Sequence, residues 1–139
     1  MKHSHGPKAL ATLIALTCFC SAVFAQAGAD DFGKREFETK CASCHGASGK
    51  GDGQMAKLLQ GGQPPDLRSL AKGNAGIFPI NRVYTSIEGV NVPGHGSRDM
   101  PVWGDEFRAK AGQGVYNPDV WVRIRILALI EYIMRLQVR

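Results

Sequence analysis

The stretch Cys41-Ala42-Ser43-Cys44-His45 determines how the rest of the chain is interpreted. Two cysteines three residues apart lie on the same face of a helical turn, so both thiols can bond to neighbouring points on the rim of one porphyrin. The imidazole of His45 follows directly and can reach under the ring to the iron. The pentapeptide therefore predicts one covalently attached haem, with Cys41 and Cys44 as attachment points and His45 as an axial ligand.

Two other kinds of site use similar residues. A thioredoxin-like redox pair has the Cys-x-x-Cys spacing but belongs to a βαβ unit, whereas the residues before Cys41 have a helical pattern. A zinc site could combine this stretch with His95. However, structural zinc sites use well-separated ligand pairs, and Cys44 beside His45 is hard to aim at one tetrahedral ion. We therefore favour the haem site over both.

Residues 1–27 have the composition of a cleaved signal peptide. Basic residues precede the almost unbroken apolar run 9–24, and the Ala-Gln-Ala that follows has the small-x-small pattern of a signal-peptidase site. We expect cleavage after Ala25 or Ala27, with 28–139 as a single exported, periplasmic domain. The alternative is a retained anchor that would make the protein membrane-associated, although the apolar run is short for one.

Removal of this leader leaves few cysteines and a small positive charge. Cys18 and Cys20 lie in the leader, so only the two motif cysteines reach the mature domain, and no disulfide framework remains. The net charge of +5 becomes less positive without Lys2 and Lys8. No basic tract is interleaved with aromatic residues, so nothing indicates a nucleic-acid partner.

Helical periodicity at the start of the mature domain predicts a first helix that leads into the motif. Asp31 is the expected N-cap, and Gly33, Phe37 and the two motif cysteines share one face. A glycine on a buried face costs helix stability, so its presence predicts that another backbone approaches closely.

A last helix is predicted from Asn117-Pro118-Asp119 to about Gln137, because these residues suit an N-cap, a first-turn proline and an acidic first turn. Charged residues interrupt any membrane-spanning run in it. Its apolar stripe is expected at Val122, Ile126, Leu129, Ile133 and Leu136.

Glycines and prolines divide the chain between these helices. The glycine-rich segment 46–53 is expected to be a turn and not a phosphate-binding loop, since no strand precedes it. Short helices are predicted over 55–59 and 67–70, the second capped by Asp66. A longer helix, 79–88, is expected to place three apolar residues on one face: Ile80, Val83 and Ile87.

The segment 90–104 lacks periodicity and is rich in turn formers. A loop this long in a compact domain usually has a function. Met100 is the favoured sixth ligand of the iron, because a thioether is soft and the following proline stiffens its approach. Met55 and Met134, which lie on helical patterns, and His95 are alternatives, as is an open or water-held position.

Further side chains are candidates for the haem pocket. The carbonyl of Pro64 or Pro65, in a rigid loop, could accept the second N–H of His45. Four other side chains carry hydrogen-bond donors suited to the haem propionates: Arg68, Tyr84, Arg98 and Trp103. Each candidate also has a simpler explanation, which is turn rigidity for the prolines and core packing or solvation for the four donors.

Over essentially all of the mature domain the sequence resembles the class I c-type cytochromes, in particular the small bacterial ones. Beyond the haem pentapeptide, Gly33 and Phe37 stand where the family has a glycine and an aromatic residue on its first helix. Leu129 and Tyr132 look like the family's pair on the final helix. The resemblance implies an all-α cytochrome c fold, with three to five helices around one covalently bound haem c and with crossing N- and C-terminal helices.

The resemblance also implies that Pro64 or Pro65 orients the proximal histidine and that Met100 is the distal ligand. It implies an electron carrier, not an enzyme, that serves redox protein partners such as a dehydrogenase, a cytochrome complex or an oxidase. We expect a monomer or a subunit of a complex, with membrane contact only if the leader is retained. The alternatives are a haem protein whose open sixth site binds a gas or peroxide, and a cytochrome subunit that docks by its final helix.

Overall fold

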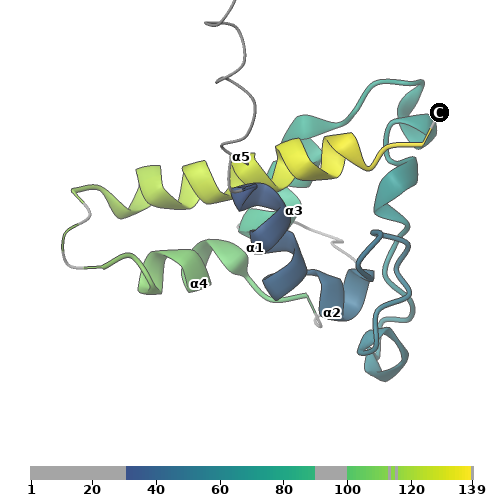
Figure 1. Cartoon of the computed structure of the whole chain (residues 1–139), viewed down its shortest axis with the longest axis horizontal. Helices are drawn as coiled ribbons and strands as arrows, with labels where there is room; N and C mark the ends of the chain where they lie inside the picture. The colour runs from purple at the N-terminus through teal and green to yellow at the C-terminus, as the bar shows by residue number, and fades with distance from the viewer. Residues whose placement is uncertain (1–30, 90–99, 113, 115, 139) are drawn as a thin grey trace, which may run out of the picture. The chain divides into compact units, whose positions relative to one another are not determined.

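The structure is a computed structural model that describes residues 31–89, 100–112, 114 and 116–138. Residues 31–139 form one compact unit of the chain. Its described part contains five α-helices and three short 3₁₀-helices and no strand (Figure 1), which confirms the expected all-α fold. The predicted signal peptide lies outside the described residues. Within those residues, no helix has the length and apolar composition needed to span a bilayer.

Helix α1 (Phe32–Lys40) begins as its sequence predicts, because the Asp31 carboxylate accepts the backbone N–H of Lys34 at 2.9 Å. The helix crosses α5 (Pro118–Arg135), as Figure 1 shows. A Cβ atom built on Gly33 would lie only 2.2 Å from the carbonyl oxygen of Ala128. The prediction that another backbone approaches this glycine is therefore confirmed, and the backbone belongs to α5.

Helix α5 also starts at its predicted residue. The side chain of Asn117 accepts the backbone N–H of Asp119 at 2.9 Å, and Pro118 occupies the first turn, where its missing N–H costs nothing. Four residues of the predicted stripe are buried, and Leu136, just past the helix, packs against them partly buried. The buried four are Val122, Ile126, Leu129 and Ile133.

Helix α3 (Ile80–Glu88) packs on α5 through Val83 and Ile87, which are both buried. It ends at Gly89, whose φ of 79° is readily adopted only by glycine. The expectation that Ile80 shares the buried face is wrong, because its side chain is 45% exposed. Ile80 is the first helical residue, and the face that packs on the core begins one turn later.

Helix α4 (Trp103–Ala109) is a correction to the predicted loop 90–104, since the helix begins before that loop was expected to end. Asp105 and Glu106 lie in its first turn, where their charges favour the helix dipole. Phe107 is fully buried, and its ring stacks on that of Trp103 with centroids 5.8 Å apart. Residues 90–99 lie outside the described part of the chain.

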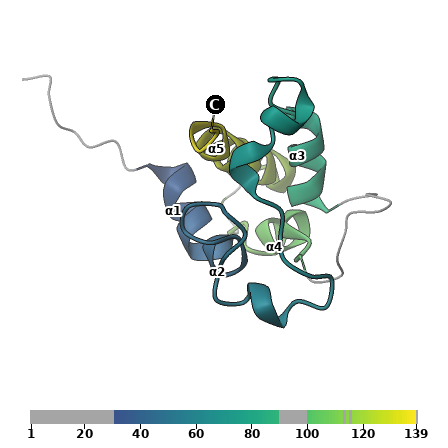
Figure 2. The same cartoon turned by 90° about the vertical axis from the view of Figure 1, so that its right-hand side faces the viewer.

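The core lies where these helices meet α5. Figure 2 shows α5 nearly end-on, with α3 beside it and α1 and α4 below it. The largest fully buried side chains include Phe37 of α1, Phe107 of α4 and Leu129 of α5. Three 3₁₀-helices connect these elements on the side of the motif: η1 (Ala56–Leu58), η2 (Leu67–Ser69) and η3 (Lys72–Asn74).

A buried ion pair joins α1 to α5 beside this core. The guanidinium of Arg125 donates to both carboxylate oxygens of Glu36, at 2.6 and 3.0 Å. The two side chains are only 13% and 8% exposed. The guanidinium also lies over the ring of Phe107, 4.7 Å from its centroid. One arginine therefore links α1, α4 and α5.

Candidate functional site

The motif lies at the junction between α1 and the short helix α2 (Ala42–His45). The N–H of Cys41 still bonds to the carbonyl of Phe37 at 2.8 Å, and the N–H of His45 bonds to the carbonyl of Cys41 at 2.8 Å. Gly46, with a φ of 77°, then ends the helix. The two cysteines and the histidine thus follow one another on a helical turn, as the spacing predicts.

The glycine-rich loop after α2 folds back under the motif. The N–H of Gly51 bonds to the carbonyl of His45 at 2.7 Å, and the N–H of Leu67 bonds to the carbonyl of Gly49 at 2.8 Å. A Cβ atom on Gly51 would lie 2.2 Å from the carbonyl oxygen of Pro64. The glycines therefore allow the proline segment to lie against the histidine.

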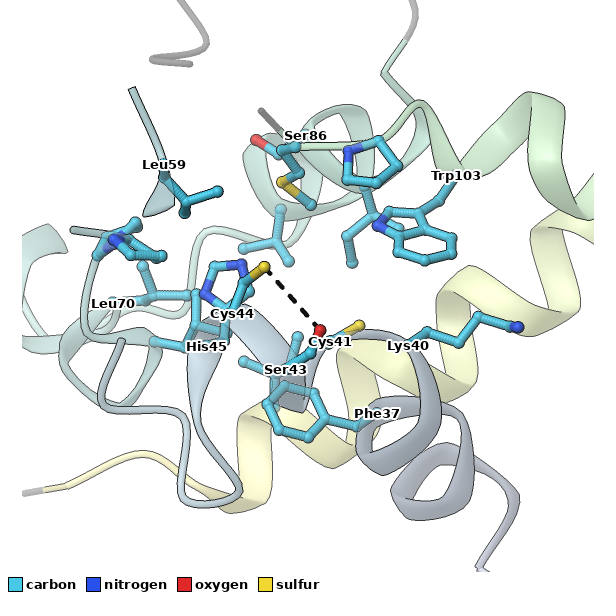
Figure 3. Close-up of a pocket in the computed structure, with 18 of the residues that line it drawn as sticks. Phe37, Lys40, Cys41, Ser43, Cys44, His45, Leu59, Leu70, Ser86 and Trp103 are labelled. Atoms are coloured by element: carbon cyan, nitrogen blue, oxygen red, sulfur yellow. Dashed lines mark hydrogen bonds between the residues drawn. The ribbon is translucent and has the colours of Figure 1, made fainter. Parts of the chain in front are cut away.

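A cavity of about 570 Å³ lies above the motif. Its volume falls in the range typical of small-molecule and cofactor sites, roughly 300–1,000 Å³. Figure 3 shows Cys41, Cys44 and His45 along one side of this cavity and Ser86 and Trp103 across from them. Most of the lining surface is apolar, and its aliphatic side chains are Leu59, Leu67, Leu70, Val83, Ile87 and Ile133.

The structure brings most of the predicted site residues to this cavity. Besides the motif, these are Pro64, Pro65, Met100 and Trp103. Met55 and Met134 do not line the cavity, and both are exposed. Met100 is therefore the one described methionine at the cavity, whereas His95 lies outside the described residues.

Two of the predicted propionate partners lie elsewhere. Arg68 is not in the cavity lining and is paired with Asp66, whose carboxylate it meets at 2.8 Å. These hydrogen bonds from Arg68 lower the pKa of Asp66 to about 2. Tyr84 is also outside the lining and packs, partly buried, against the core. Arg98 lies outside the described residues.

Two cationic side chains at the cavity were not predicted. Arg82 lines it from α3, one turn before Ser86, and Lys40 lines it from the end of α1. The Lys40 ammonium also lies 5.9 Å from the ring centroid of Trp103. Arg82 and Ser86 are four residues apart, so both lie on one face of α3. This spacing is the sequence signal that could have identified Arg82.

The chemistry of the cysteines distinguishes the candidate sites. Burial raises the pKa of the Cys41 thiol to about 12, and the nearby carboxylate of Glu36 contributes to the rise. A thiol this weakly acidic stays neutral near pH 7, whereas a reactive redox cysteine acts as the thiolate. Together with the helix that leads into Cys41, this disfavours the thioredoxin-like pair. The zinc site is disfavoured by geometry, because among the described residues no group of three or more His, Cys, Asp or Glu side chains could hold a metal ion.

The residues present fit a covalently held haem. The cavity is largely apolar and combines two neighbouring sulfurs with an imidazole, and it also contains a methionine thioether. Arg82 and Lys40 could neutralise the propionates.

Comparison with known protein families gives a match. The family model described as Cytochrome c matches residues 31–116, which include α1 to α4 and every residue of the motif. No curated protein and no solved structure matches the chain.

Proposed function

The chain belongs to the cytochrome c family, and from this premise we propose that it carries single electrons between redox proteins and does not transform a substrate. Members of this family hold haem c covalently, and Cys41 and Cys44 have the required spacing before His45. The observation that carries the proposal is the cavity. It brings the motif together with Met100, which is distant in sequence.

The chain's own residues have separate roles in this proposal. When bound, the haem iron supplies a couple between the ferrous and ferric states. Cys41 and Cys44 would tether the porphyrin, while His45 and Met100 would be the ligands of the iron, a pair that favours a relatively high reduction potential. With Met100 as a ligand, the iron would have no open position for a gas or peroxide.

The cavity walls complete the site. Aliphatic side chains exclude water, and a drier site favours the less charged reduced state of the iron. Arg82, Lys40 and Trp103 supply donors for the propionates. We propose that the redox partners dock where the cavity opens, and the chain's positive net charge would steer an acidic partner to it.

We also propose a location for the protein, on the basis of the sequence of its first residues. A basic start, an apolar run and a small-residue cleavage pattern support export to the periplasm with removal of the leader. The mass of the purified protein tests both this and haem attachment. It should equal the polypeptide from residue 26 or 28 plus one haem, and a mass without haem would contradict the proposal.

Optical spectra test the ligands. We expect the ferric protein to show the near-infrared band of sulfur bound to iron, and the Met100→Ala variant to lose it. Met55→Ala is the matched control, because Met55 is exposed and lies outside the cavity, so the band should remain. Rapid binding of carbon monoxide by the untreated ferrous protein would instead indicate an open sixth position.

A further inference from the structure

The face of α5 that points away from the core is apolar and exposed. None of the described helices covers this face, since α1, α3 and α4 all pack on its other sides (Figure 2). Four of its apolar side chains are each between 43% and 52% exposed: Val120, Ile124, Leu127 and Met134. A single exposed apolar residue is ordinary, but several exposed apolar residues on one face of a helix mark an interaction surface.

The charges on this outer face are arranged symmetrically about its middle. Arg123 lies four residues before Leu127 and Glu131 four residues after it, so that the three form one ridge along the helix. Val120 and Met134 lie seven residues before and after the same leucine. A two-fold rotation about Leu127 therefore exchanges the positions of Arg123 and Glu131, which have opposite charges. It also exchanges the positions of Val120 and Met134, which are both apolar.

We propose that this outer face binds a second copy of the chain, with the two α5 helices antiparallel and a two-fold axis close to Leu127. In the commonest class of helix packing, the i±4 ridges of both helices run side by side and the axes cross at about −50°. In that arrangement the ridge of one copy runs beside the same ridge of the other in the opposite direction. Arg123 then meets Glu131 of the second copy, and the contact occurs twice.

The charges favour this occupant over others. A parallel copy would place Arg123 against the same arginine. An acidic protein partner would meet Glu131 with a like charge, and a membrane would leave this carboxylate at the apolar boundary. Arg123 makes no ion pair with any described residue, whereas Glu131 meets Arg135 of its own helix at 3.1 Å, with 59% and 47% of these side chains exposed. Such an exposed pair is weak and can yield to a new partner.

The proposed interface leaves the haem cavity open. No residue of the outer face lines the cavity, to which α5 contributes only Ile133 from its opposite side. Each copy could therefore still meet a redox partner. One helix crossing another buries less than the roughly 800 Å² per partner of a standard interface, so we expect a dimer that dissociates on dilution.

Charge reversal tests the proposal on the haem-loaded protein. Sedimentation is measured over about a hundredfold range of concentration for the wild type, for Arg123→Glu and for Glu131→Arg. Each single reversal creates two contacts between like charges, because the symmetry doubles every change, and should weaken the dimer by about tenfold or more. Lys57→Glu, an equal change of charge on η1, is the matched control and should leave it intact.

The decisive measurement mixes the two single variants. One then carries two negative charges on the outer face and the other two positive charges, so the mixture should restore a dimer that neither variant forms alone. The double variant with both reversals should dimerise like the wild type. Heat unfolding of each variant at low concentration shows whether the monomer itself remains folded.

Several outcomes would overturn the proposal. One is a wild type that stays monomeric at all concentrations, and another is a mixture of the two variants that does not associate. A monomer that binds vesicles of anionic lipid, and loses this binding with Leu127→Glu, would assign the outer face to a membrane. A dimer that survives both single reversals would use another surface.

Discussion

Gly33 is the position where the crossing of α1 and α5 depends most directly on one residue. A Cβ atom there would lie 2.2 Å from the carbonyl oxygen of Ala128 and 3.2 Å from Cβ of Tyr132. Since ordinary contacts between carbon atoms begin at about 3.5 Å, Gly33→Ala should push the two helices apart by on the order of 1 Å. The obstacle is backbone and cannot rotate away as a flexible side chain would.

The expected loss follows from two opposing effects. Overpacking of this kind costs ~1–3 kcal/mol. The replacement of glycine by alanine within a helix returns roughly 1 kcal/mol. We therefore expect the free energy of unfolding of the haem-loaded protein to fall by up to about 2 kcal/mol, which for a domain of this size lowers the melting temperature by up to about 10 °C.

Urea unfolding followed by circular dichroism measures this change. Gly73→Ala is the matched control, because nothing lies within 4 Å of a Cβ atom at Gly73 in η3. The control should be neutral or slightly stabilising, since it only restricts the unfolded chain. If Gly33→Ala is as stable as Gly73→Ala, the reasoning from the close approach at the helix crossing is refuted.

Three further changes test other parts of the structure. Arg125→Met should leave the carboxylate of Glu36 buried without its partner and lower the free energy of unfolding by about 3–5 kcal/mol, and adding Glu36→Gln should recover part of this loss in a double-mutant cycle by urea unfolding. Phe107→Ala should lower the free energy of unfolding by about 3–5 kcal/mol in the same assay, because removal of this fully buried ring leaves a cavity. A loss as small as that expected for a substitution at an exposed site would contradict its place in the core. Asp66 has its pKa lowered from 3.8 to about 2 by Arg68, so its contribution to stability is present above pH 3.8 and is lost as the pH falls through about 2. The difference in melting temperature between the wild type and Asp66→Asn should therefore shrink over this range, and a constant difference would exclude the ion pair as its cause.

The ends of the domain could be predicted from the sequence because their signals are local. Asp31 and Asn117 cap their helices by hydrogen bonds to residues two or three positions later, and such spacing is visible in the chain itself. The close approach at Gly33 was also predictable, since a glycine on an apolar helix face costs stability unless a second backbone packs against it. The spacing of the motif is also local, and it predicted that the two cysteines and the histidine share one helical turn.

The features that were missed depend on tertiary contacts. Helix α4 has only seven residues, and it follows a loop rich in glycine and proline, so its periodicity is too short to recognise. Arg82 reaches the cavity only because of the way α3 packs on α5. Arg68 was expected at the haem, but its guanidinium instead donates a hydrogen bond to Asp66, two residues earlier.

The packing of the first helix against the last also bears on how the protein is made. A chain that grows from its N-terminus completes α1 early and α5 late. Phe37 of α1 therefore cannot pack against Tyr132 until α5 has been made; in the finished domain the centroids of the two rings are 5.2 Å apart. During this interval both motif thiols remain open to solvent and to the maturation machinery. In the finished domain Cys41 is partly buried against the core, and burial raises the pKa of its thiol to about 12. We therefore expect the bonds to the porphyrin to form before the domain closes, so that the order of synthesis protects the chemistry that the finished fold would hinder.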